Sequence, residues 1–277
     1  PGYAMAYSNL GNILREIGKL KEAEISTRKA IEINPELVVA YSNLGSILID
    51  LGKLKEAEAS LCKAIKLKPN YAVAHVNLGN IKLLLGDYEL GLEHYEFRDR
   101  TKSIHAIPKI KEINQTKLQK KDKLLIVSEQ GLGDTIQYMR YIPYLRDQGI
   151  NITLCAQKKL HTLIKSSGID SNPITPEQVD MISEGKWMRL LSIAKYLKIN
   201  PKKPIITKPY ISASQELINK WKNILSKEEK PIIGINWQGN KNIENNYKGR
   251  SIPLEIFSTL IEQNNVKMLS LQKGFGS

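Results

Sequence analysis

The feature that most constrains this chain is an internal repeat with a period of 34 residues, from Tyr7 to Tyr41 to His75. The segment YSNLGNILREIGKLKEAEISTRKAIEINP begins at Tyr7, a close copy begins at Tyr41, and a shorter copy begins at His75. Two glycines recur at the same places in every copy: Gly11, Gly45 and Gly79, then Gly18, Gly52 and Gly86. A period of this length is typical of stacked helix pairs, each of which buries its apolar face against the next.

The copies resemble the tetratricopeptide repeat, a helix-turn-helix unit of this period. The first glycine is expected to let two helices approach closely, and the second to end one helix before the next begins. Small residues that keep the second helix thin, and prolines that end each unit, also recur: Ala23 and Ala30, Ala57 and Ala64, Pro35 and Pro69. The resemblance implies an all-α solenoid over residues 1–100, and the register of Pro1 predicts that it begins inside a longer array.

An asparagine recurs on the first predicted helix of each copy, at Asn9, Asn43 and Asn77. Asparagine is a poor helix former, so three in register need a reason. The first helices line the concave face of such solenoids. An amide ladder there would grip the backbone of an extended peptide, as in the superhelix of the O-linked N-acetylglucosamine transferase, which these repeats resemble. The alternative is that the amides bond neighbouring repeats and hold the stack together, and both interpretations stay open.

The repeat pattern ends after Phe97, and a different architecture follows. Residues 101–122 combine dense charge with one proline and no clean period, so we interpret them as a connector. Apolar runs rich in β-formers then occur as KLLIVSE, NITLCAQ, PIIGINWQ and VKMLSLQ, with a helix-sized segment inside each pair. Alternating strands and helices predict parallel sheets, here in two Rossmann-like sets.

The stretch EQGLGDTIQ joins the first of these strands to a helix through a glycine-rich turn. It has the first two glycines of a dinucleotide fingerprint, but Ile136 takes the third position and Asp134 would repel phosphate from the helix N-terminus. No Gly-Lys-Ser/Thr follows, which excludes a P-loop. Asp134 is therefore a helix cap or a catalytic acid-base. The turn lies where α/β sheets place ligands, and it is expected to bring Glu129, Gln130, Asp134 and Gln137 together.

Three stretches, EQGLGDTIQYMRYIPYL, WQGN and GRSIPLEIFSTLI, resemble a bacterial family related to the heptosyltransferases, in which this domain is fused to tetratricopeptide repeats. The resemblance covers residues 123–277. It implies a GT-B glycosyltransferase, with an acceptor-side Rossmann-like domain at 123–229 and the start of a donor-side domain at 230–277. It also implies a nucleotide-sugar donor as substrate, with no cofactor and no metal.

Carried over residue by residue, the resemblance makes Asp134 the general base that deprotonates the acceptor hydroxyl. Lys241 and Arg250 would neutralise the donor diphosphate as its charge grows. The alternative is that both belong to a solvated loop of a lysine-rich chain. The predicted substrate contacts are Gln130, Gly131, Gly133 and Gln137 on the acceptor side, and Trp237, Asn240, Lys241, Arg250 and Ser251 on the donor side.

The chain departs from that family because it stops after one βαβ unit of the second domain. We therefore expect a fragment or a degenerate member, inactive by itself. Its unpaired sheet edge is expected to promote homo-oligomers or aggregates through residues 232–271. Two functions stay open: a glycosyltransferase whose repeats present the acceptor, and a non-catalytic protein-binding module that uses the repeat groove.

Composition limits the remaining classes. The chain is 42% hydrophobic and 25% charged, which are globular values. No apolar run reaches the roughly 20 residues of a membrane span and no signal peptide opens the chain, which predicts a cytoplasmic protein. The net charge of +13 comes without a nucleic-acid motif, so nucleic acid is not the expected partner. Cys62 and Cys155 show no metal-ligand spacing, and both are expected to be buried.

Overall fold

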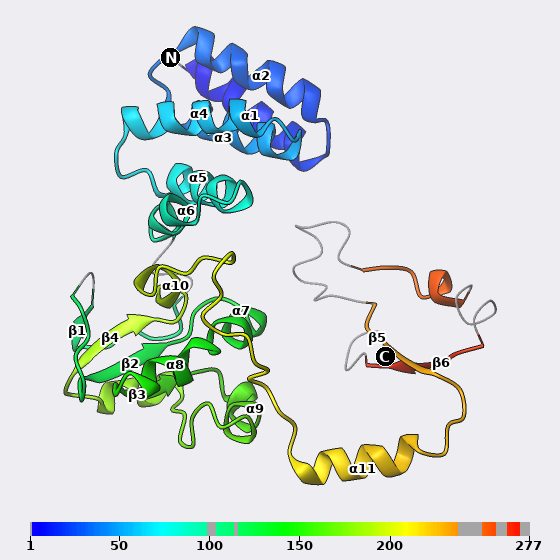
Figure 1. The fold of residues 1–277 in the computed structure, drawn as a ribbon. Coiled ribbons are helices and arrows are strands. Elements are labelled where there is room, and N and C mark those ends of the chain that lie inside the picture. Colours follow the sequence, from blue (N-terminus) through cyan, green and yellow to red (C-terminus); the bar gives the residue numbers. More distant parts are fainter. Residues whose placement is uncertain (1, 99–103, 114–115, 238–250, 259–264, 272–277) are drawn as a thin grey trace. The chain divides into compact units, whose positions relative to one another are not determined.

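The computed structural model describes residues 2–98, 104–113, 116–237, 251–258 and 265–271. The chain divides into two compact units, Pro1–Ser212 and Ala213–Ser277, and each is described by itself. The first unit contains a helical part and an α/β part with a parallel sheet (Figure 1). The predicted order of a helical solenoid before an α/β region is confirmed. The division after Ser212 lies upstream of the sequence-based boundary at residue 230.

Three consecutive helix pairs form the helical part. They are α1 (Gly2–Glu16) with α2 (Leu20–Ile33), α3 (Val38–Asp50) with α4 (Leu54–Leu67), and α5 (Ala72–Leu84) with α6 (Tyr88–Tyr95). The second glycine of each repeat has a positive φ, such as 73° at Gly52, which glycine adopts without strain. Gly52 N–H donates to the Ile49 carbonyl at 2.9 Å, and Lys53 N–H donates to the Leu48 carbonyl at 2.8 Å. This Schellman arrangement satisfies the last carbonyls of α3, so the glycine ends the helix as predicted.

The first glycine of each repeat lies where two helices meet. A Cβ atom at Gly45 would come within 2.6 Å of the Leu61 side chain, and one at Gly79 within 2.9 Å of the Gly91 carbonyl oxygen. The alanines of the second helices, Ala23, Ala30, Ala57 and Ala64, are fully buried. Both predicted roles are therefore confirmed. The expectation of two buried cysteines is wrong for Cys62, which is exposed because the buried positions of α4 are Ala57, Leu61 and Ala64.

The sheet of the α/β part has four parallel strands in the order β1-β4-β2-β3. Their bounds are β1 (Lys111–Glu112), β2 (Lys123–Val127), β3 (Asn151–Cys155) and β4 (Lys186–Arg189). The segment 101–122, interpreted from sequence as a connector, supplies β1, and its Ile104 pairs with Glu129 in an isolated antiparallel bridge. This segment is thus part of the domain's sheet.

The two faces of this sheet are covered differently. One face packs against α7 (Leu132–Tyr138), α8 (Tyr141–Asp147), α9 (His161–Ser166) and α10 (Ile193–Tyr196) through a core that includes Ile126, Leu145, Leu154 and Ile164. The other face carries Leu125, Val127 and Trp187, and its described cover comes from residues of the 104–110 segment and from 174–182, which includes the short 3-10 helix η2 (Pro176–Met181). A second 3-10 turn, η1 (Lys158–Leu160), precedes α9.

Strand β3 lies at an edge of the sheet, and side chains close its outer side. Asp170 accepts a hydrogen bond from the Leu154 amide at 3.0 Å, and Arg146 donates to the Ile152 carbonyl at 3.0 Å. Arg146 and Asp170 also form an ion pair at 3.0 Å. Backbone groups that an edge strand normally offers to another chain are therefore already bonded, which protects this edge against pairing with another molecule.

The second unit contains α11 (Gln215–Leu225) and the parallel strands β5 (Ile232–Ile235) and β6 (Lys267–Ser270). Ser214 caps α11 by accepting a hydrogen bond from the Leu217 amide at 3.3 Å. The two predicted strands of this region are present and pair as expected. None of the residues of α11 is buried.

Candidate functional site

The first helix of each pair carries four equivalent residues along one of its sides. Residues spaced by four, three and four positions lie on one side of a helix. They are Met5, Asn9, Asn12 and Glu16 on α1, Val39, Asn43, Ser46 and Asp50 on α3, and Val73, Asn77, Asn80 and Leu84 on α5. We call this set the inner stripe. The first helices contact one another, α1 with α3 and α3 with α5, so the stripe runs across three neighbouring helices.

The in-register asparagines occupy the middle of the inner stripe. The Nδ2 amide of Asn43 donates to Ser8 Oγ at 3.0 Å, and that of Asn77 donates to Ser46 Oγ at 2.9 Å. Both side chains are half-buried, whereas Asn9 is exposed. The amide nitrogens thus link adjacent first helices, as the packing alternative requires. Among the described residues, no hydrogen bond reaches the Oδ1 oxygen of Asn43 or Asn77, so a peptide contact through these oxygens stays a prediction.

A buried ion pair lies at the carboxyl end of β2. Arg98, just after α6, donates from Nε to Glu129 Oε2 at 3.0 Å and from Nη2 to Glu129 Oε1 at 2.7 Å. Glu129 is fully buried and also accepts from the Leu191 amide at 3.2 Å, while Arg98 is 4% exposed and also contacts Glu96 and Ser192. Burial opposes the charged form of Arg98, but the bonds to Glu129 outweigh it and raise the pKa of Arg98.

The Arg98–Glu129 ion pair lies at the position where α/β sheets of this topology usually bind a ligand. The chain leaves β2 toward β3 on one side and returns to β4 on the other, so β2 and β4 flank the switch point. Glu129 follows β2, and Leu191 follows β4. The guanidinium of Arg98 therefore joins the last repeat to the switch point. Glu129 belongs to the cluster predicted from sequence, whereas Arg98 was not predicted, because it begins a run of charged residues after the last repeat.

The predicted catalytic residue, Asp134, lies in the first turn of α7. Its Oδ2 atom accepts a hydrogen bond from the Gly131 amide at 3.0 Å. Gly131 is the N-cap residue, so Asp134 caps the helix from its third position and not from the N-cap itself. Asp134 is half-buried, and Gly131 and Gly133 are exposed. Its role as a general base stays a prediction.

Four polar residues were expected to cluster around this turn, but their side chains do not share a partner. Gln130 has a positive φ of 61° and donates to the Tyr95 hydroxyl at 3.1 Å. Glu129 accepts hydrogen bonds from Arg98, and Gln137 is exposed. Within the described residues, no hydrogen bond joins Asp134 to Gln130 or Gln137. The structure therefore brings the turn together with the end of α6, but does not bond these four side chains to one another.

The predicted donor-side residues belong to the second unit. Trp237 and Ser251 are half-buried, and the Trp237 carbonyl accepts from the Ile252 amide at 2.9 Å. Asn240, Lys241 and Arg250 lie outside the described residues. The roles predicted for all five stay predictions.

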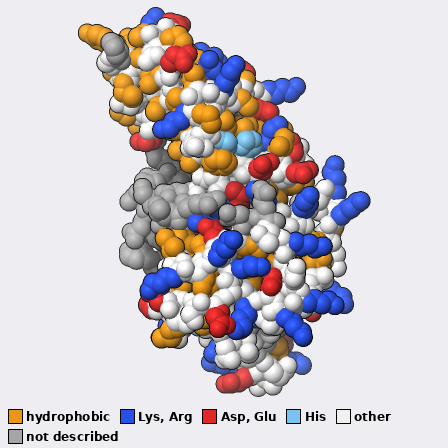
Figure 2. Space-filling model, turned by 90° about the vertical axis from the view of Figure 1, so that its left-hand side faces the viewer, with side chains coloured by type: hydrophobic (Ala, Val, Ile, Leu, Met, Phe, Trp, Pro, Cys, Tyr) orange, Lys and Arg blue, Asp and Glu red, His pale blue; other side chains and the backbone are white. Residues whose placement is uncertain are grey.

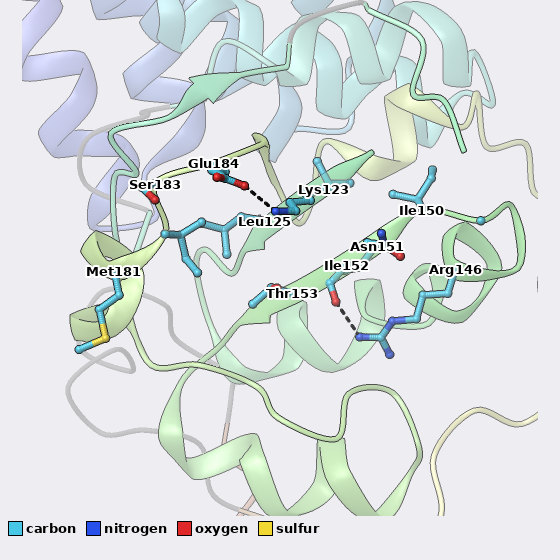
Figure 3. A pocket seen from close by; sticks show the side chains of 13 residues that line it. Lys123, Leu125, Arg146, Ile150, Asn151, Ile152, Thr153, Met181, Ser183 and Glu184 are labelled. Atoms are coloured by element: carbon cyan, nitrogen blue, oxygen red, sulfur yellow. Dashed lines mark hydrogen bonds and ion pairs between the residues drawn. The ribbon is translucent and has the colours of Figure 1, made fainter. Parts of the chain in front are cut away.

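A cavity of about 730 Å³ lies along β2 and β3 (Figure 3). Its lining includes Lys123 and Asn151, the first residues of these strands, whereas the Asp134 turn follows the last residue of β2. Lys123 and Glu184 form an ion pair at 2.5 Å beside it, and Arg146 bonds the Ile152 carbonyl. None of the residues predicted from sequence lines this cavity. Its charged lining groups already pair with the protein, so they do not point to a ligand.

Two family models match the helical part, each described as a tetratricopeptide repeat, over residues 4–37 and 38–71. Residues 4–71 are two tetratricopeptide repeats. The pair α5–α6 continues their register beyond the matched residues. No curated protein matches the chain. Among the described residues, no helix combines the length and apolar character needed to cross a bilayer, and no group of three or more His, Cys, Asp or Glu is placed to hold a metal ion.

Similar solved structures include the second TPR domain of Spaghetti (RPAP3) bound to the HSP90 peptide SRMEEVD, MamA, and the TPR2B-domain:pHsp70 complex of yeast Sti1. Their sequence identities to this chain are 22%, 24% and 24%, and their TM-scores are 0.34, 0.33 and 0.34. The matches cover 34%, 34% and 35% of this chain, and 88%, 55% and 78% of those chains.

Proposed function

We propose that the helical part binds an extended segment of a partner protein along the inner stripe. The observation that carries the proposal is the row of asparagines in register, two of which are oriented by hydrogen bonds to the preceding first helix. Fixing the amide nitrogen in this way also fixes the direction of the amide oxygen. An extended peptide offers backbone N–H groups at regular intervals, and main-chain hydrogen bonds of this kind give affinity with little dependence on peptide sequence.

The rows on either side of the asparagines suit the side chains of such a peptide. Met5 is 41% exposed and Val73 is 53% exposed, and together with Val39 they form an aliphatic row. The row on the other side, Asn12, Ser46 and Asn80, is polar. A peptide whose backbone follows the asparagines would place alternate side chains on these two rows.

Asn43→Ala is expected to weaken peptide binding by roughly three- to tenfold, the effect of one lost hydrogen bond. The probe is the tightest binder selected from a random extended-peptide library against the whole chain, and its affinity is measured by fluorescence anisotropy. Ser8→Ala is the matched control, since it removes the bond from Asn43 to Ser8 Oγ but keeps the amide oxygen and the 3.5 Å bond from Asn43 Nδ2 to the Ser8 carbonyl, which still orients the amide. Equal losses in both variants, or a library that yields no binder, would show that the asparagines serve packing alone.

A second proposal is that the α/β part transfers a sugar from a nucleotide-sugar, the donor being a substrate. The observation in its favour is that Asp134 lies half-buried after a parallel strand, with only its Oδ2 atom engaged by a described residue. Such a carboxylate can accept a proton from a hydroxyl. A thermal-shift screen with nucleotide-sugars tests the donor side, and no stabilisation by any of them would contradict this proposal.

Asp134 offers a substitution that separates capping from catalysis. Asp134→Asn keeps an oxygen that can accept the Gly131 bond, so the free energy of unfolding should change by less than about 0.5 kcal/mol, whereas Asp134→Ala should lose about 1 kcal/mol. If Asp134 is the base, Asp134→Asn should lower sugar transfer by about 10²-fold or more. Urea denaturation measures the first effect and a transfer assay the second. Full activity in the asparagine variant would leave Asp134 as a cap only.

A further inference from the structure

A cleft of about 1100 Å³ separates the last helix pair from the α/β part, within the first unit. It is lined by α6 on one side and by the carboxyl ends of β1 and β4 on the other. Its walls carry opposite charges. Figure 2 shows acidic side chains at the lower end of the helical part and many Lys and Arg side chains on the α/β part below. Cavities at domain junctions and at the carboxyl edge of parallel strands are common ligand sites.

The wall formed by the last helix pair is acidic. Glu89 and Glu93 lie one turn apart on α6, on the same side of the helix, and both line the cleft. Both are exposed, and neither forms an ion pair with another described residue. Like charges four residues apart destabilise a helix, so a cation held between them would relieve the repulsion.

The opposite wall is basic. Lys117, Lys195 and Lys198 line it, and none of them pairs with an acidic side chain among the described residues. The lysines and glutamates thus face one cleft without reaching one another. A ligand that spans the cleft would bring each wall the opposite charge that it lacks.

Arg189 adds to the basic wall a donor for which no described residue supplies an acceptor. Its side chain is 7% exposed, lines the cleft, and donates from Nε to Glu112 at 3.1 Å. The guanidinium carbon also lies 5.6 Å from the Trp187 ring centre. Its Nη1 atom is buried and has no hydrogen-bond partner among the described residues. A buried N–H that has lost water without gaining an acceptor is costly, and a bound ion or water is one of the ways in which native proteins satisfy such a group.

We infer that this cleft binds a small zwitterion, with an oxyanion group near Arg189 and Lys195 and a protonated amine near Glu89 and Glu93. The site is separate from the inner stripe and from the Asp134 turn. Its ligand class follows from the two walls: a simple anion would leave the glutamates unpaired, and a simple amine would leave the arginine and lysines unpaired.

Calorimetric titration of the whole chain at low ionic strength tests this inference, with O-phosphoethanolamine as the probe. Inorganic phosphate carries only the anionic group of this probe, and ethanolamine carries only its protonated amine. Phosphoethanolamine should bind at least about tenfold more tightly than phosphate, because it gains the acidic wall as well. Equal affinity for the two, or no binding of phosphoethanolamine, would overturn the inference, and a water at Nη1 would then explain the unpaired atom.

Single substitutions assign each half of the ligand to its wall. Glu93→Gln should weaken phosphoethanolamine about tenfold and leave phosphate unchanged. Lys195→Gln should weaken both, as should Arg189→Gln if that variant keeps the fold. Glu22→Gln is the matched control, since it makes the same charge change at an exposed site on α2 and should alter neither affinity. If both Glu93→Gln and Lys195→Gln keep wild-type affinities, the cleft is not the binding site.

Discussion

Glu129→Leu is expected to lower the free energy of unfolding by about 3–5 kcal/mol, because it leaves the Arg98 guanidinium buried without its main partner. Arg98→Met should cost a similar amount, reduced to the extent that the Glu129 carboxyl takes up a proton and becomes neutral. The pair is suited to this test because Glu129 is fully buried and Arg98 is 4% exposed. Urea denaturation of a variant that keeps Trp187 as its one tryptophan, with Trp221 and Trp237 replaced by Phe, reports on the α/β core by fluorescence, because Trp187 is 3% exposed.

The double variant Arg98→Met/Glu129→Leu is the control. Two apolar side chains of similar volume leave no unpaired charge, so its loss of stability should be smaller than the sum of the single losses by about 2–3 kcal/mol. Some loss should remain, because the Leu191 amide then has no Glu129 acceptor. Single losses below about 1 kcal/mol, the range of exposed pairs, would contradict the buried arrangement.

The same network couples the helical and α/β parts. Arg98 follows α6 and contacts both Glu129 and Ser192, and Tyr95 of α6 accepts a hydrogen bond from Gln130. The last repeat is therefore bonded to the turn that precedes Asp134. If the α/β part acts on what the repeats bind, this contact fixes the geometry between the two sites.

Elements whose formation is decided by the local sequence pattern could be predicted from sequence. Elements that depend on tertiary contacts could not. The helix pairs were predicted because glycines in register mark both helix ends and close contacts. Strands β2, β3, β5 and β6 were predicted because each is an apolar run. Strand β4 was missed because its letters, KWMR, begin and end with charges. Those charges are tolerated because Lys186 pairs with Asp122 and Arg189 with Glu112.

The site residues divide in the same way. Asn43 and Asn77 could be found because their register repeats, but which atoms they bond depends on Ser8 and Ser46 of the preceding helix. Asp134 could be found from the glycine-rich turn. Arg98 could not, because its partner is 31 residues away and nothing local distinguishes it from the neighbouring charges. A sequence signal for Glu129 itself is that this acid comes two residues after Val127, at the end of an apolar run.

Ile47→Ala is expected to lower the free energy of unfolding by about 2–5 kcal/mol, the cost of a cavity in a packed core. The matched control lies one repeat earlier: Ile13 occupies the same register on α1 but is 55% exposed, whereas Ile47 on α3 is fully buried against neighbouring helices. Both substitutions make the same change in helix propensity, because both positions lie in helix interiors. Ile13→Ala should therefore cost less than about 1 kcal/mol, since little apolar area leaves a packed environment.

The difference between these variants measures how much stability comes from stacking and how much from each helix pair alone. In a repeat array each unit contributes its own stability and an interface with its neighbour. A second pair of equivalent positions shows the same difference in burial between α1 and α3: Leu10 is 46% exposed, and Leu44 is 3% exposed. Circular dichroism during urea denaturation gives both free energies. Equal losses of stability for Ile13→Ala and Ile47→Ala would contradict this prediction and mean that the α1 face is covered in solution as fully as the α3 face. If self-association covers it, the loss for Ile13→Ala should depend on protein concentration. If the loss does not depend on concentration, another partner covers it.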